Sequence, residues 1–95
     1  MDPNISIHEL ETIVELGTQY VGPHGDALAH VYGTAAMLRD LSPTERQRQK
    51  LADVVAEFRA WFTHGGPARE DGVADPGRQR VRSALADLKQ AYRPG

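Results

Sequence analysis

The 95-residue sequence contains no cysteine. This absence excludes disulfide bridges, metal sites built on thiolates and cysteine nucleophiles, and it fits a reducing compartment. No apolar run reaches the roughly 18 to 20 residues that a membrane span requires. The first ten residues, MDPNISIHEL, lack the charged-then-apolar pattern of a secretory signal. We therefore expect a cytoplasmic protein that does not enter a membrane.

Positive charge is missing from the first 38 residues, which hold five acidic residues and neither lysine nor arginine. All 11 basic residues lie from Arg39 onward, so the two parts carry −5 and +3 and the net charge is −2. This asymmetry indicates either an interaction surface or an internal pairing of the acidic first segment with the basic later ones. Arginine far outnumbers lysine, as is typical of bacterial or phage proteins from genomes of high GC content.

The strongest helix pattern lies in the middle of the chain. Ser42 and Glu45 form a Ser-x-x-Glu capping box, with Pro43 at the first helical position. An apolar stripe with spacings of three and four follows, and it holds the only tryptophan and both phenylalanines: Leu51, Val54, Val55, Phe58, Trp61 and Phe62. The Gly-Gly-Pro sequence at 65–67 ends the pattern. We predict a helix over about 43–63.

Three further helices are predicted from the same signals. Ser6 and Glu9 form a second capping box, Asp26 caps the next helix, and Pro76 opens the last one. Their predicted ranges are about 6–21, 26–40 and 77–92. No stretch alternates with period two for long enough to predict a strand. The predicted fold class is all-α, a compact four-helix bundle that forms a single domain over 1–95.

Some local features are predicted as well. Ile5 is expected to pack onto Leu10 as a hydrophobic staple. Leu41 and Ser42 form a very short connection, which predicts antiparallel or steeply crossed helices on either side. The segment 65–76 is rich in glycine, proline and charge. It is the only long connection, and we expect it to be a mobile loop.

Two surfaces suit self-association. The second helix is rich in small residues, namely Ala27, Ala29, Gly33, Ala35 and Ala36. They allow close approach of another backbone, either inside the bundle or in a second copy. The last helix carries a heptad-like stripe of Val81, Ala84, Leu85, Leu88 and Tyr92. A homodimer through either surface would add to the modest core of so short a chain.

The histidine and carboxylate residues do not form a known metal or catalytic signature. Paired Glu-x-x-His motifs, the zincin motif, the Gly-x-Ser-x-Gly elbow and a glycine-rich phosphate loop are all absent from the sequence. His30 is expected to hydrogen-bond to Asp26. His24, His30 and His64 could form a weak site, so a metal- or small-ligand-binding bundle is the third alternative. We expect no catalytic activity, no cofactor and no bound metal.

The sequence LSPTER at 41–46 resembles the opening of helix-turn-helix modules in bacterial sigma factors and response regulators. In those modules a short helix, a turn and a recognition helix follow, whereas here the helical pattern continues from Gln47 to His64 without a breaker. The resemblance implies a nucleic-acid-associated regulator, which is the second alternative. A basic patch for this role would combine Arg46, Arg48, Lys50, Arg78, Arg80 and Arg82. The negative net charge argues against it.

Protein binding is the function that the sequence favours. The protein would be an adaptor, an accessory subunit or an inhibitor that contacts an acidic surface of another protein. The candidate contact residues are Arg46, Arg48, Lys50, Trp61, Arg78 and Arg82. Tryptophan is a frequent interface anchor. The position of Trp61 in the apolar stripe, beside Phe58 and Phe62, favours the core for this side chain.

Overall fold

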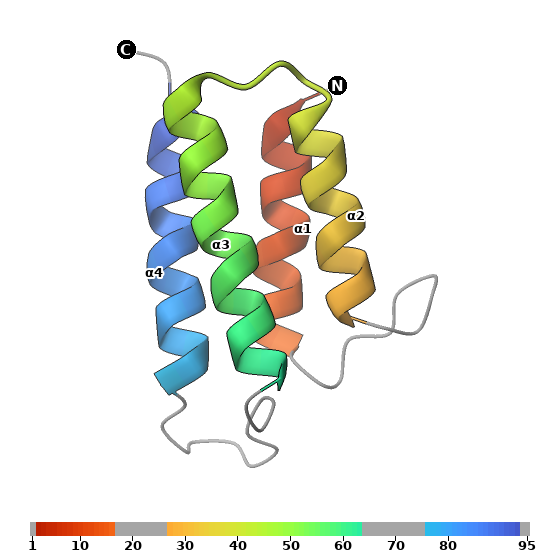
Figure 1. Ribbon diagram of the computed structural model, residues 1–95, viewed down its shortest axis with the longest axis vertical. Coiled ribbons are helices and arrows are strands. Elements are labelled where there is room, and N and C mark those ends of the chain that lie inside the picture. The colour runs from red at the N-terminus through yellow and green to blue at the C-terminus, as the bar shows by residue number, and fades with distance from the viewer. Residues whose placement is uncertain (1, 17–26, 64–75, 94–95) are drawn as a thin grey trace.

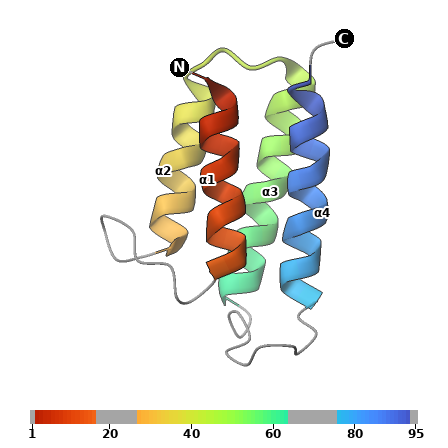
Figure 2. The same cartoon turned by 180° about the vertical axis from the view of Figure 1, so that it is seen from behind.

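The computed structural model describes residues 2–16, 27–63 and 76–93. It contains four helices: α1 (Pro3–Leu16), α2 (Ala27–Arg39), α3 (Glu45–Thr63) and α4 (Pro76–Ala91). Successive helices run in opposite directions, and each packs against the next, with α4 closing the ring against α1 (Figures 1 and 2). The predicted all-α four-helix bundle is confirmed. Among the described helices, none combines the length and apolar composition needed to cross a membrane.

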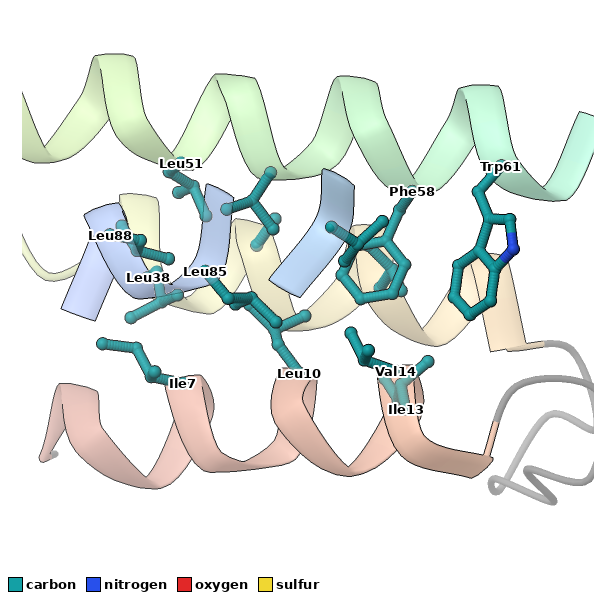
Figure 3. Close-up of a cluster of buried hydrophobic side chains, with 14 residues drawn as sticks. Ile7, Leu10, Ile13, Val14, Leu38, Leu51, Phe58, Trp61, Leu85 and Leu88 are labelled. Atoms are coloured by element: carbon teal, nitrogen blue, oxygen red, sulfur yellow. The ribbon is translucent and has the colours of Figure 1, made fainter. Parts of the chain in front are cut away.

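The core runs along the bundle axis and receives side chains from all four helices (Figure 3). Its members are at most 4% exposed: Ile7, Leu10, Ile13, Val14, Val31, Ala35, Leu38, Leu51, Val54, Phe58, Trp61, Val81, Leu85 and Leu88. Each large side chain stabilises the fold by about 1.5 to 3 kcal/mol relative to an exposed position. The interface between α3 and α4 is the most extensive of the four.

The start of α3 differs from the prediction, because a different capping box is used. The amide of Gln47 donates to Oγ1 of Thr44 at 3.1 Å, and the amide of Thr44 donates to Oε1 of Gln47 at 2.9 Å. Ser42 has a positive φ of 56° and precedes the helix. The sequence holds two overlapping boxes, and the later one forms. The connection between α2 and α3 is therefore longer than predicted and spans 40–44.

The start of α1 also differs, because the helix begins three residues earlier than predicted. Asp2 accepts a hydrogen bond at Oδ1 from the amide of Asn4 at 2.9 Å, which is the contact of an N-cap. Ser6 consequently lies inside the helix, where it is 5% exposed. Ile5 is 68% exposed, so the predicted staple onto Leu10 is wrong.

Several predicted features lie outside the described residues. They include the end of the first helix beyond Leu16, the Asp26 cap, His24, His64 and the loop over 65–75. Pro76 is the first residue of α4, as predicted.

Candidate partner-binding surfaces

Three of the predicted contact residues lie near the start of α3, at the end of the bundle where α2 leads into α3 (Figure 1). Arg46 and Arg48 are exposed, and Lys50 is half-buried. Arg48 lies 3.5 Å from Glu45, in an exposed pair that contributes little stability. Within the described part of the chain, neither Arg46 nor Lys50 forms an ion pair. We call Arg46, Arg48 and Lys50 the α3 basic cluster.

The surroundings of the α3 basic cluster add to its positive potential. The segment 39–50 holds four basic and two acidic residues, which gives it a net charge of +2. The N-terminus of α3 points in the same direction and contributes roughly half a positive charge from the helix dipole. This end of the bundle is therefore a surface that attracts negative charge.

Trp61 lies in the core rather than on the surface. Its side chain is 4% exposed, and its ring centroid lies 5.0 Å from that of Phe62 and 6.4 Å from that of Phe58. Gly77, in the first turn of α4, packs directly against the indole. The expectation that Trp61 reaches the surface as a partner contact is wrong, and its interpretation as a core residue is confirmed.

The side chain of Arg78, in the first turn of α4, contacts two other helices. Its guanidinium lies over the Trp61 ring at 5.4 Å from the centroid. Its Nε donates to the backbone carbonyl of Val14 at 3.2 Å, within the last turn of α1. A cation is favourable both over an indole face and beside the carbonyls that end a helix. Arg78 is thus engaged within the bundle rather than presented to a partner.

Arg82 is engaged in the same way, one turn further along α4. Its Nε and Nη2 donate to the two carboxylate oxygens of Glu15, at 3.0 and 2.7 Å. The hydrogen bonds from Arg82 hold the pKa of Glu15 below its ordinary value, and the same contact raises the pKa of Arg82. This bidentate pair joins α1 to α4.

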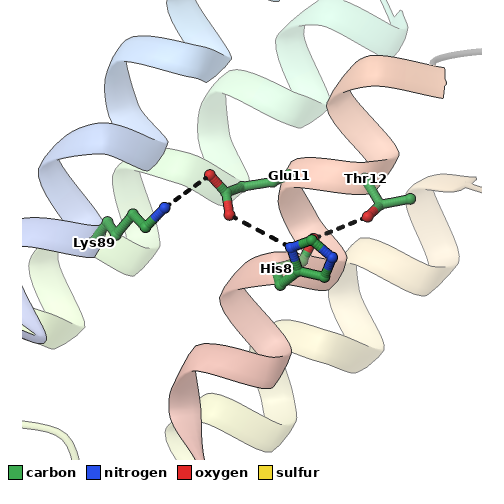
Figure 4. Close-up of polar contacts among 4 residues, drawn as sticks. All are labelled: His8, Glu11, Thr12 and Lys89. Atoms are coloured by element: carbon green, nitrogen blue, oxygen red, sulfur yellow. Dashed lines mark hydrogen bonds and ion pairs between the residues drawn. The ribbon is translucent and has the colours of Figure 1, made fainter.

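The seam between α1 and α4 contains further charge pairs (Figure 4). Nζ of Lys89 donates to Glu11 at 3.3 Å, and Nδ1 of His8 lies 3.9 Å from the other oxygen of the same carboxylate. The hydroxyl of Thr12 donates to the backbone carbonyl of His8 at 3.1 Å. Acidic residues of the first helix therefore pair with basic residues of the last one. The charge asymmetry of the sequence is thus in part an internal pairing, through Glu11 and Glu15.

The basic patch predicted from six residues does not form. The α3 basic cluster lies in the first turns of α3, whereas Arg78, Arg80 and Arg82 lie in the first turns of the antiparallel α4, at the opposite end of the bundle (Figure 1). Arg80 also pairs across the α3–α4 interface with Glu57, at 3.4 Å. In addition, α3 is one unbroken helix, so the turn of a helix-turn-helix is absent there.

His30 forms a contact across helices. Its Nε2 lies 3.1 Å from Oε1 of Glu9, which joins α2 to α1. Its predicted partner, Asp26, lies outside the described residues. In the described part of the chain, no group of three or more side chains is placed to hold a metal ion.

The outer face of α2 holds three of the small residues for which the sequence predicted close approach of another backbone, namely Ala29, Gly33 and Ala36. Tyr32 and Met37 are 39% and 43% exposed, and a Cβ added at Gly33 would meet no atom within 4 Å. Ala29 and Ala36 are exposed beside them. We call these five residues the α2 outer face. Internal packing, one of the two expectations for the small residues of this helix, holds for Ala35, which is buried, but not for the small residues of this face.

No protein-family model matches the sequence. Comparisons with curated proteins and with solved structures also give no match. The function is therefore inferred from the charge, exposure and contacts of the described residues.

Proposed function

We propose that the protein is a small, non-catalytic cytoplasmic interaction module, which binds an acidic surface of another protein through the α3 basic cluster. The observation that supports it is a contrast between two groups of basic residues. One group is engaged in contacts between helices and comprises Arg78, Arg80, Arg82 and Lys89. The other is the α3 basic cluster, in which Arg46 and Lys50 form no ion pair with any described residue.

The start of α3 is held in a fixed geometry, which suits a binding surface. The Thr44–Gln47 capping box closes the first turn. Nε2 of Gln47 also donates to the carbonyl of Ala91 at 3.1 Å, which ties this turn to the end of α4. A preorganised surface loses less conformational entropy on binding. Its positive potential would speed association with an acidic partner.

Capture from the native cell lysate tests this proposal, with the tagged full chain as bait. Bound protein and bound nucleic acid are both quantified after washes at about 50 mM and about 500 mM salt, because charge-based contacts are screened at high salt. The variants Arg46→Glu and Lys50→Glu place negative charge in the cluster. Arg59→Glu is the matched control, because Arg59 is exposed on the same helix about 20 Å from Arg46.

We expect one protein partner in stoichiometric amount at low salt, less of it at high salt, strong loss with either cluster variant, and full retention with Arg59→Glu. Equal capture by all four baits would contradict the assignment of the cluster. Recovery of nucleic acid that salt releases steeply would favour the regulator instead. An empty capture would count against the interaction module.

A further inference from the structure

The α2 outer face differs from the exposed faces of the other helices in having no charge. Residues 27–38 contain no Asp, Glu, Lys or Arg, and charge begins only at the end of α2, with the exposed Arg39 and Asp40. The exposed sides of the other helices carry charge at Glu15, Glu45, Arg46, Arg48, Asp53, Arg59, Arg80, Arg82, Asp87 and Lys89. A helix that is apolar all round is usually covered on every side. Among the described helices, α1 and α3 pack against α2, and both lie on its inner side (Figures 1 and 2).

The apolar surface continues from α2 onto α1. The contact between Glu9 and His30 fixes the register of these antiparallel helices. Ile5 lies one turn before Glu9, which places it beside α2 about one turn after His30, at the level of Gly33. Its side chain is 68% exposed, the largest exposure among the large hydrophobic residues described. Ile5 is thus an exposed apolar residue beside the α2 outer face, with the contact between Glu9 and His30 one turn away.

The heptad-like stripe of α4, the other surface expected to suit a homodimer, is excluded. Val81, Leu85 and Leu88 are at most 4% exposed and contribute to the core of the single chain. Of the two surfaces expected to suit a homodimer, only the one on α2 remains.

We infer that the α2 outer face binds a second copy of this chain, with the two α2 helices antiparallel across a two-fold axis at Gly33. The first reason is the absence of charge. A charged partner surface would lose hydration against this face without gaining an ion pair, whereas an identical uncharged face loses little. A two-fold contact places the same surface on both sides.

The second reason is that large and small residues of the face complement each other in this arrangement. In two antiparallel helices related by a two-fold axis at Gly33, a residue of one copy lies opposite a residue of the other copy when the sum of their two residue numbers is about 66. Met37 of one copy then lies over Ala29 of the other, and Tyr32 lies over Ala36. Gly33 faces its own counterpart, and the space around it allows the two backbones to approach closely.

The size of the face sets the expected affinity. The 13 residues of α2 span about 20 Å, so one helix pair covers less than the roughly 800 Å² per partner of a standard interface. A weak dimer is expected, with a dissociation constant of about 10 μM to about 1 mM. Because the face is uncharged, association should not weaken with salt. This dimer is independent of partner binding by the α3 basic cluster.

Sedimentation equilibrium of the full chain tests the inference over about 10 μM to about 1 mM, the range expected for such an interface. The mass should rise with concentration from 10.5 kDa towards twice that value, equally at low and high salt. Gly33→Glu should remain monomeric, because the two-fold axis places two negative charges together. Ala56→Glu is the matched control on an exposed site of α3 and should dimerise like the wild type.

Mixing tests the register itself. Gly33→Glu and Gly33→Lys should each be monomeric alone, and an equimolar mixture should recover dimer, because opposite charges then meet at the axis. Helical circular dichroism checks that each variant is folded, and Ala36→Glu replaces Gly33→Glu if the latter is not. A wild type that is monomeric throughout, a Gly33→Glu that dimerises, a mixture that stays monomeric, or assembly beyond the dimer would each overturn the inference.

Discussion

Gly77 of α4 lies so close to Trp61 of α3 that a Cβ atom added to it would be 2.8 Å from Cγ and 3.0 Å from Nε1 of the indole. The absence of a side chain at this position lets the first turn of α4 pack directly against the indole. Gly77→Ala should therefore destabilise the fold by about 1 to 3 kcal/mol, as overpacking of a core does. Urea denaturation followed by circular dichroism measures the change.

Gly33→Ala is the matched control for that substitution. Gly33 lies in the interior of α2, and a Cβ there meets no atom within 4 Å. Since glycine costs about 0.5 to 1 kcal/mol relative to alanine inside a helix, this variant should be more stable than the wild type by roughly that amount. Stability should be measured at low protein concentration, where the chain is monomeric and the inferred dimer does not contribute. Equal effects of the two substitutions would contradict the packing of Gly77 on Trp61.

Trp61→Ala should cost about 3 to 5 kcal/mol, because it removes a large buried ring and leaves a cavity. The free energy of unfolding measures this cost, and the loss of helical circular dichroism at moderate temperature should accompany it. If the variant instead kept its stability but no longer captured the partner, this result would support the interpretation of Trp61 as a surface contact.

Thr44→Ala should destabilise α3 by about 1 kcal/mol, because it removes the acceptor for the amide of Gln47. Ser42→Ala should change the free energy of unfolding by much less, since Ser42 precedes the helix and has a positive φ. Ser42→Gly should be neutral or stabilising, because glycine adopts positive φ without strain. Denaturation curves of the three variants decide which capping box is used, and a larger cost at Ser42 than at Thr44 would contradict the structure.

The Glu15–Arg82 pair should make stability depend on acidity. The hydrogen bonds from Arg82 make the pKa of Glu15 lower in the folded chain than its ordinary 4.5. The pair therefore stabilises the fold above pH 4.5, and this stabilisation is lost as the pH falls through the lowered pKa. Because the side chains are 58% and 42% exposed, the contribution at neutral pH is about 0.5 kcal/mol.

A double-mutant cycle with Glu15→Gln and Arg82→Gln measures this coupling. The coupling energy should be present at pH 7 and shrink as the pH falls below 4.5. A coupling that grows in acid would have the wrong sign for an ion pair.

The helices and the core were predictable from local patterns, because apolar spacing of three and four appears directly in the sequence. Leu51, Val54 and Phe58 are buried as the stripe requires. The choice between the Ser42 and Thr44 capping boxes was not predictable, because both satisfy the same local rule. Helix ends depend on how the connection crosses the bundle, and short-range patterns do not contain this information.

The sequence also could not predict which basic residues form contacts within the bundle and which do not. Arg46 and Arg82 look alike as exposed positions of predicted helices, and only the placement of α1 beside α4 gives Arg82 a carboxylate partner. Which side of α2 faces solvent could not be predicted either, for a different reason. Its residues are nearly all apolar or small, so no charged side identifies which of them face solvent.

The contrast between the α3 basic cluster and the α4 arginines can be measured by a titration with poly-L-glutamate, followed through the amide signals of the ¹⁵N-labelled full chain. At about 20 mM salt, where charges are weakly screened, the signals of residues 45–50 should shift while those of residues 78–82 stay in place. Arg46→Glu should abolish the shifts, and Arg59→Glu should preserve them. Equal shifts at both ends of the bundle, or none at either, would contradict the assignment of available positive charge to the start of α3.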